Sequence, residues 1–166
     1  MFDNVSTPKE LFVHKLGAAL TMERKVLGML DDLTEAAQSE ELEQQFRHHR
    51  QETEGQIRNL EQCFHSLGEQ ENDSPCPAIE GLEKEGKATI KLTDENLHDA
   101  VVLSAAAETE HHEIAVYEGL IEHAEAMGAT DVAALLRENL EQEEHTLREV
   151  QHATGKVAQR TAQMAG

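Results

Sequence analysis

Residues 108–120 read ETEHHEIAVYEGL, a stretch in which two adjacent histidines stand between acidic residues. Imidazole and carboxylate groups both bind transition metals, so the stretch is a candidate metal site. At about 100° per residue on a helix, Glu110 falls in the centre of the apolar stripe and Glu113 lies roughly 45° to one side. His112 points almost directly away from the core, and His111 lies on the flank. The glutamates, rather than the His-His pair, are therefore the predicted ligands.

Glutamates also lie on the apolar sides of two other predicted helices. Glu23 is centred in the stripe of the first helix and Glu143 in that of the last. A lone glutamate in such a place more often pairs with a cation or reaches solvent. Here three helices each supply one near their midpoints, and midpoints are level in an antiparallel bundle. We therefore expect the carboxylates to meet in one interior layer. The apolar residues of the three stripes are Phe12, Leu16, Leu20, Leu27 and Leu30; Leu103, Ala106, Ile114, Tyr117 and Ile121; and Val132, Leu136, Leu140, Leu147 and Val150.

Several buried carboxylates need a counter-charge. Shared protons, buried cationic side chains or bound metal could supply it. Arg50, on the shoulder of the second helix, supplies part of the charge but cannot offset all the glutamates. Coordination of two divalent ions by oxygen is the most economical solution, and oxygen ligands suit Fe or Mn.

The second helix gives a weaker signal. Thr53 holds its central position, with His49, Glu52 and Gln56 to one side. We expect Glu52 to provide a bridging carboxylate after some rotation of the helix. His49 faces inward and is either a further metal ligand or a hydrogen-bonded core histidine.

Four long helices and one short one must position these residues. Start signals are Thr7 with Pro8 and Glu10, which form a capping box, and Ser39 as the second cap. Gly68 and Gly128 are stop signals. The predicted helices cover residues 8–37, 40–67, 78–92, 95–127 and 130–153. The last residues, 154–166, carry no apolar stripe and are expected to form a flexible tail, which leaves residues 1–153 as a single bundle domain.

This pattern predicts an all-α protein. Short connectors pair the first helix with the second, and the fourth with the fifth, in antiparallel hairpins. The central connection is long enough to cross the length of the bundle and carries the short helix. A four-helix bundle with one long crossover is the ferritin-like arrangement.

Composition and charge exclude several other classes. The chain has 166 residues and a formal net charge of −19, which disfavours nucleic acids and anionic membranes as partners. No apolar run is long enough to span a bilayer, and the N-terminus lacks a signal-peptide core. Cys63 and Cys76 have no metal-type spacing and are expected to be reduced thiols. The expected location is the cytoplasm.

Five segments in order resemble the YciF-type ferritin-like proteins, over roughly residues 8–150. They are LFVHKL, HHRQETEGQIRNLEQ, EGLEKEG, ETEHHEIAVYEGL and LLRENLEQEE. The resemblance implies a bundle that is usually dimeric, a dinuclear metal site and a bacterial role in stress responses. Carried over by position, it implies Glu23, Glu52, Glu110, Glu113 and Glu143 as the ligand set.

The chain departs from the wider ferritin-like pattern. That pattern places Glu-x-x-His on the second and fourth bundle helices. Here Gly55 follows Glu52 by three residues and Thr146 follows Glu143 by three. Leu147 stands where relatives carry an acidic residue. Fewer ligands imply weaker metal binding, one ion or none.

Three functions follow from these observations. The first is a di-iron or di-manganese centre that handles oxygen or peroxide, with a small oxidant or metal ions as partners. The second is iron storage, which needs a large assembly that nothing in the sequence specifies. The third is a non-enzymatic stress-related scaffold with a weak or empty site. Whether the protein is an enzyme stays open, and Tyr117 is expected to be a core residue with a satisfied hydroxyl rather than a redox partner.

Overall fold

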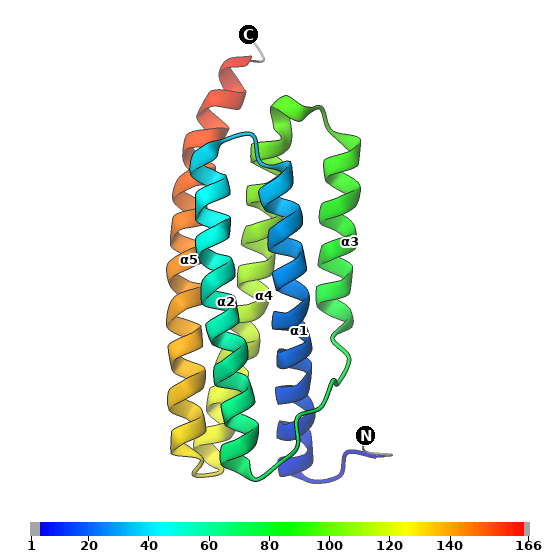
Figure 1. Ribbon diagram of the computed structural model, residues 1–166, viewed down its shortest axis with the longest axis vertical. Helices are drawn as coiled ribbons and strands as arrows, with labels where there is room; N and C mark the ends of the chain where they lie inside the picture. Colours follow the sequence, from blue (N-terminus) through cyan, green and yellow to red (C-terminus); the bar gives the residue numbers. More distant parts are fainter. Residues whose placement is uncertain (1–3, 165–166) are drawn as a thin grey trace.

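The computed structural model describes residues 4–164, which form α-helices and no strand. Four long helices lie side by side along the length of the molecule: α1 (Pro8–Ala36), α2 (Glu40–Leu67), α4 (His98–Ala126) and α5 (Thr130–Met164) (Figure 1). α1 and α2 pair in an antiparallel hairpin, as do α4 and α5. Between α2 and α4 the chain crosses the length of the bundle, so these two helices run parallel. This is the predicted ferritin-like four-helix bundle with a long crossover.

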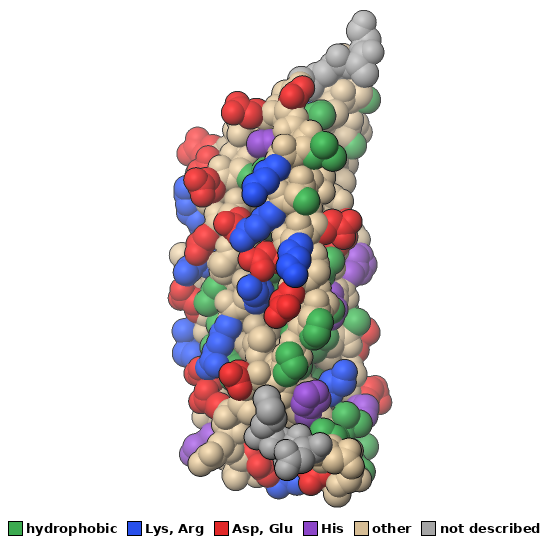
Figure 2. All heavy atoms as spheres, turned by 90° about the vertical axis from the view of Figure 1, so that its right-hand side faces the viewer, with side chains coloured by type: hydrophobic (Ala, Val, Ile, Leu, Met, Phe, Trp, Pro, Cys, Tyr) green, Lys and Arg blue, Asp and Glu red, His purple; other side chains and the backbone are tan. Residues whose placement is uncertain are grey.

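The crossover carries the short helix α3 (Pro77–Leu92) and a 3₁₀ turn, η1 (Glu95–Leu97). α3 lies outside the four-helix bundle and packs on α1 and α4 (Figure 1). Its predicted apolar stripe serves this packing, since Ile79 is fully buried and Leu82 and Ile90 are partly buried. The outer surface of this region is highly charged: Figure 2 shows Lys and Arg interleaved with Asp and Glu over this face. Among residues 4–164, no helix is long and apolar enough to cross a membrane.

The extended part of the crossover is held against α1. It begins at Gly68, which adopts the left-handed φ of 66° that favours glycine. The Asn72 side chain then occupies the place that a Cβ atom at Gly17 would take. Its amide nitrogen donates to the carbonyl of Val13 at 3.4 Å, and the Ser74 hydroxyl lies 3.0 Å from Nδ1 of His14. Gly17 therefore allows the crossover to approach α1 closely.

The helix caps confirm one prediction and correct another. The Thr7 hydroxyl accepts from the Glu10 amide at 3.2 Å, and the Glu10 carboxylate accepts from the Thr7 amide at 2.9 Å. The prediction that the Ser39 side chain caps α2 is wrong. Asp99 at the start of α4 binds the turn before α2 instead, because Oδ1 accepts from the amides of Gln38 at 2.8 Å and Ser39 at 3.2 Å.

The predicted helix end at Ala153 is also wrong, because α5 continues to Met164. Ala153 and Val157 are buried at helical spacing and continue the apolar stripe. Lys156 and Arg160 then pair with acidic residues of α2 and α4. These contacts outweigh the roughly 1 kcal/mol that a glycine costs within a helix, here at position 155. Residues 165–166 of the predicted tail, like residues 1–3 of the predicted domain, lie outside the described residues.

We predict that Gly155→Ala stabilises the protein by about 0.5–1 kcal/mol. A Cβ atom at this helical position meets no neighbouring atom. Urea denaturation measures the change, and Gly68→Ala should act in the opposite direction because of its positive φ. An unchanged free energy of unfolding in Gly155→Ala would show that α5 does not persist past Ala153 in solution.

Candidate metal centre

The interior of the bundle is apolar towards both ends and polar in the middle. Four glutamates and one histidine meet there, each at most 2% exposed: Glu23 from α1, His49 from α2, Glu110 and Glu113 from α4, and Glu143 from α5. All five were singled out from helix phase in the sequence. The structure brings these residues together, while their binding of metal stays a prediction.

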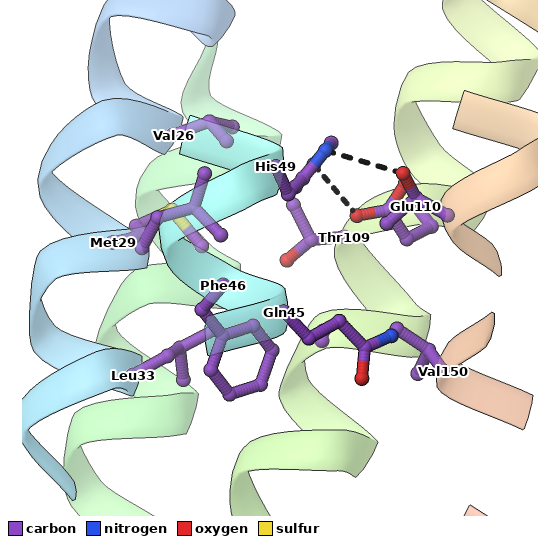
Figure 3. Close-up of a pocket in the computed structure, with 12 residues that line it drawn as sticks. Val26, Met29, Leu33, Gln45, Phe46, His49, Thr109, Glu110 and Val150 are labelled. Carbon is purple, nitrogen blue, oxygen red and sulfur yellow. Dashed lines mark hydrogen bonds and ion pairs between the residues drawn. The ribbon is translucent and has the colours of Figure 1, made fainter. Parts of the chain in front are cut away.

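A compact group forms the centre of this layer. His49, Glu110, Glu113 and Glu143 each offer one ligand atom, and these atoms all lie within 4.8 Å of one another. Nε2 of His49 lies 3.1 Å from Oε1 of Glu110 and 3.7 Å from Oε2 of Glu143. Figure 3 shows His49 pointing from α2 toward Glu110. Such spacing suits atoms that share one or two cations.

Glu23 is held at the edge of this group by Tyr117. The phenol donates a short hydrogen bond to Oε1 of Glu23, and its oxygen accepts from Nδ2 of Asn139 at 3.1 Å. Asn59 on α2 donates to Oδ1 of Asn139 at 2.8 Å. Tyr117 is thus the core tyrosine with a satisfied hydroxyl that the sequence predicted, and it fixes the orientation of a carboxylate.

Most of the carboxylate oxygens lack hydrogen-bond partners. Within the described residues, both oxygens of Glu113 and of Glu143, Oε2 of Glu23 and Oε2 of Glu110 have none. A buried carboxylate oxygen without a partner costs several kcal/mol, and folded proteins avoid it. These oxygens and one imidazole match the ligand preference of Fe or Mn, so the residues present fit a metal centre.

Burial and mutual repulsion change the pKa values of these groups. Burial raises the pKa of Glu23 to about 7, although the hydrogen bond from Tyr117 and the charge of His49 lower it. Burial and the nearby carboxylates raise the pKa of Glu113 and of Glu143 well above the usual range. Burial alone would lower the pKa of His49, but the neighbouring carboxylates, Glu110 foremost, raise it well above its ordinary value. The site therefore holds protons that a cation would displace.

Glu52, the predicted bridging ligand, does not belong to the compact group. Its side chain is 20% exposed. Oε2 lies 3.5 Å from Nδ1 of His49, and Oε1 lies 3.6 Å from Nε2 of His48. The contact with His49 lowers the pKa of Glu52 despite partial burial. The helix rotation that would bring Glu52 inward is absent, because Thr53 is the residue of α2 that faces the centre, and its hydroxyl donates to the carbonyl of His49 at 3.0 Å.

The two adjacent histidines stay outside the centre, as helix phase predicts, although one of them is less exposed than expected. His111 is exposed. His112 does not point freely into solvent: it is half-buried, with Nε2 3.8 Å from Sγ of Cys76 at the start of α3. The crossover covers this side of α4, which a wheel of one helix cannot reveal. Cys76 and Cys63 are free thiols, as expected.

Arg50 does not supply the counter-charge. It faces the surface, where Nε lies 2.8 Å from Asp31 and Nη1 lies 2.5 Å from Glu54. Within residues 4–164, no arginine or lysine is buried in the polar layer. The only nearby cationic group of the described layer is therefore the imidazole of His49.

Sequence reasoning missed several buried polar residues around the centre. Thr146 places Oγ1 3.2 Å from Nδ1 of His49, and Asn139 donates to the carbonyl of Gln56 at 3.2 Å. Their spacing from Glu143, four residues before and three after, would have placed Asn139 and Thr146 on the same face of α5. The buried polar residues outside the five ligand candidates are Thr53, Gln56, Thr109, Asn139 and Thr146.

Comparison with known proteins gives matches over nearly the whole chain. The family described as Domain of unknown function (DUF892) matches residues 7–163. Protein YciF of Escherichia coli (strain K12) is 36% identical over 145 residues, covering 86% of this chain and 87% of that protein. The crystal structure of this E. coli stress protein aligns with a TM-score of 0.88 and 32% identity, over 93% of this chain and 98% of that one.

Two further solved structures share the fold. YcfI from Rhodopseudomonas palustris aligns with a TM-score of 0.87 and 33% identity, over 91% of this chain and 98% of that one. A protein from Xanthomonas campestris aligns at 20% identity with a TM-score of 0.76, over 96% of this chain and 99% of that one, which bears on the fold alone.

The fold and the buried glutamate–histidine group define a ferritin-like helical bundle with a candidate metal centre. The chain belongs to the YciF-type family, DUF892.

We predict that the metal-free protein loses stability as the pH rises from 5 to 8. Folded Glu23 keeps its proton up to a pKa of about 7, whereas the unfolded chain releases it near 4.5. The stabilisation is thus complete below pH 4.5 and is lost as the pH rises through 7, a change of about 3 kcal/mol from Glu23 alone. The raised pKa values of Glu113, Glu143 and His49 act in the same direction.

Urea denaturation in the presence of a chelator measures this dependence. Glu23→Gln should flatten it, because the amide does not titrate. Stability that rises with pH over this range in the wild-type protein would contradict the burial of these carboxyl groups.

We also predict that His111→Ala and His112→Ala leave the metal content unchanged, because both side chains lie outside the compact group. Elemental mass spectrometry of the purified variants measures it. Loss of metal in the His112 variant would mean that the phase of α4 is wrong.

Proposed function

We propose that this protein binds two divalent transition-metal ions, Fe or Mn, in its buried carboxylate layer and acts on oxygen or peroxide in a stress response. The observation that carries the proposal is the set of buried carboxylate oxygens without hydrogen-bond partners, beside an imidazole. If nothing bound these oxygens, their burial would destabilise the bundle.

Each residue has a distinct role in this proposal. His49, Glu110, Glu113 and Glu143 hold the ions, and Glu23 adds a carboxylate whose orientation Tyr117 fixes. When bound, the ions supply the redox capacity that the side chains lack. The surrounding helices exclude bulk water from the layer, which strengthens electrostatic interactions within it.

A cavity of about 10 Å³ adjoins two of the proposed ligands. It holds roughly one water molecule. His49, Glu110 and Thr146 are among the residues that line it, and apolar residues such as Val26, Leu30 and Phe46 form most of the rest. The cavity as it stands has no room for a large organic substrate beside these ligands.

A second candidate function is a non-enzymatic, stress-related helical scaffold with a weak or empty site. Thr146 favours it. At a position where the ferritin-like pattern has a histidine, its hydroxyl contacts His49 and offers no nitrogen ligand. Homodimerisation, a cytoplasmic location and the absence of nucleic-acid and membrane partners stay predictions.

Metal analysis separates the two candidates. Wild-type protein, purified without a tag, should contain about two Fe or Mn ions per chain, as expected of a dinuclear carboxylate site. Glu110→Ala and Glu143→Ala should remove them, while Glu108→Ala, on the exposed face of α4, should not. The isosteric Glu143→Gln guards against a packing defect, since it keeps the volume of the side chain.

The scaffold function predicts the opposite pattern. Wild-type protein would contain no metal, and Glu143→Gln would be more stable than wild type because it removes a buried charge without removing a ligand. That result would refute the metal-centre proposal. If metal is present, consumption of peroxide and oxidation of ferrous ion are the activities to assay.

A further inference from the structure

Gln45, His49 and Glu52 lie along one edge of α2, at spacings of four and three residues. His49 is buried in the centre, whereas Gln45 and Glu52 are only partly buried on either side of it. Gln45 lines a groove between α2 and α5, two helices that lie side by side in Figure 1. The contact with His49 lowers the pKa of Glu52 most, and Glu52 also lies near enough to His145 of α5 for the charge of that histidine to lower its pKa further. The junction between α2 and α5 is thus a place where the polar layer comes close to solvent.

A surface groove of about 470 Å³ follows this junction. Its walls carry three histidines and two glutamates, together with Arg148. His48 and His145 are well exposed, with 66% and 58% of their side chains accessible. Imidazole and carboxylate groups at a solvent-filled groove can bind a divalent transition-metal ion. The histidines and glutamates are His48, His145, His152, Glu41 and Glu149.

A series of short steps connects the groove to the centre through Glu52. Nε2 of His48 lies 3.6 Å from Oε1 of Glu52, and Oε2 of Glu52 lies 3.5 Å from Nδ1 of His49. His49 then lies 3.1 Å from Glu110 and 3.7 Å from Glu143. Behind Glu52 the oxygens of Glu143 are fully buried and without partners among the described residues. Each step is short enough for a cation to gain the next ligand before it leaves the previous one.

Gln45 gives a second connection between the same two places. It lines both the surface groove and the small cavity beside His49 and Glu110. Figure 3 shows its side chain reaching from α2 toward Val150 on α5. Its amide nitrogen is buried and has no hydrogen-bond partner in the described part of the chain. Gln45 is therefore the residue shared by the groove and the cavity, and no hydrogen bond of its amide nitrogen within the described residues fixes its side chain.

The groove between α4 and α5 does not offer an alternative. It is larger, at about 700 Å³, and it is acidic, with Glu118, Glu122 and Glu141 among its lining residues. Its lining shares no residue with the cavity beside His49 and Glu110, and Ile121 and Leu140 lie in it. Acidic charge there can attract cations to the surface, but it has no ligand atoms leading inward.

We propose that the junction between α2 and α5 is the route by which a divalent cation reaches the buried centre. His48 and His145 hold the cation in the groove, and Glu52 passes it to His49. Glu52 is a transfer residue rather than a resident ligand. This inference rests on the proposed metal centre and adds how that centre is filled.

Stopped-flow loading of the metal-free, full-length protein with Co²⁺ tests the route, because bound Co²⁺ absorbs visible light. The variant is the double substitution His48→Ala with His145→Ala. The matched control is His111→Ala with His123→Ala, which removes two exposed histidines from α4. We expect loading about tenfold slower in the variant, the lower end of the rate effects that electrostatic clefts produce. The control should load as fast as wild type, and all three proteins should reach the same final stoichiometry.

The possible failures are distinguishable. Equal loading rates in the variant and the control, at full stoichiometry, would overturn the route and leave the metal centre intact. No bound Co²⁺ in the wild-type protein would overturn the proposed function and the route with it.

Glu52→Gln tests the transfer role directly, with Glu54→Gln on the same helix as its control. Loading should slow in Glu52→Gln while the final stoichiometry stays at the wild-type value. A lower stoichiometry in this variant alone would show that Glu52 is a resident ligand and would overturn its role in transfer.

Discussion

The mutual repulsion of carboxylates in the middle of the helical bundle is the constraint that the rest of the structure must offset. Glu23, Glu110, Glu113 and Glu143 share a volume from which water is excluded. A single imidazole cannot neutralise them, so the folded chain must hold protons or cations there. The raised pKa values of the carboxyl groups correspond to the first case, in which protons are held. The proposed dinuclear metal site corresponds to the second, in which cations are held. The bundle is stable only when protons or cations are bound in the layer. The rest of the fold keeps this layer closed to water.

The helices hold the layer closed through contacts far from it. Asp99 on α4 binds the amides of the turn between α1 and α2, which ties the two hairpins together at one end. Asn72 fits against Gly17 and fixes the crossover on α1 at the other. The extension of α5 past Gly155 adds buried side chains beyond the layer. Such contacts resist the separation of helices that electrostatic repulsion would favour.

Helix phase was enough to find the four interior glutamates, because three lie in the centre of a long apolar stripe and Glu113 lies close beside it. It also placed Thr53 at the centre of α2 and Glu52 to one side, as the structure has them. The expected rotation that would bring Glu52 inward is absent, because the buried Thr53 keeps the central place. The environment of His112 depends on the crossover. A helical wheel of α4 alone does not predict the path of that segment. The end of α5 was missed because Gly155 and the polar residues after it hide the burial of Val157. The covering of His112 is a contact between elements, which local periodicity does not encode, whereas the spacing of Ala153 and Val157 was a local signal that could have been found.

The ligand candidates are spread over almost the full length of the chain. Glu23 lies on the first helix and Glu143 on the last, with His49 and the α4 pair between them. During synthesis, α1 and α2 can pair on the ribosome as a hairpin, but they bring only Glu23 and His49 to the layer. Three of the four members of the compact group arrive with α4 and α5, after the crossover has been laid down. The compact group is therefore complete only after the last helix has been synthesised and has packed against the others.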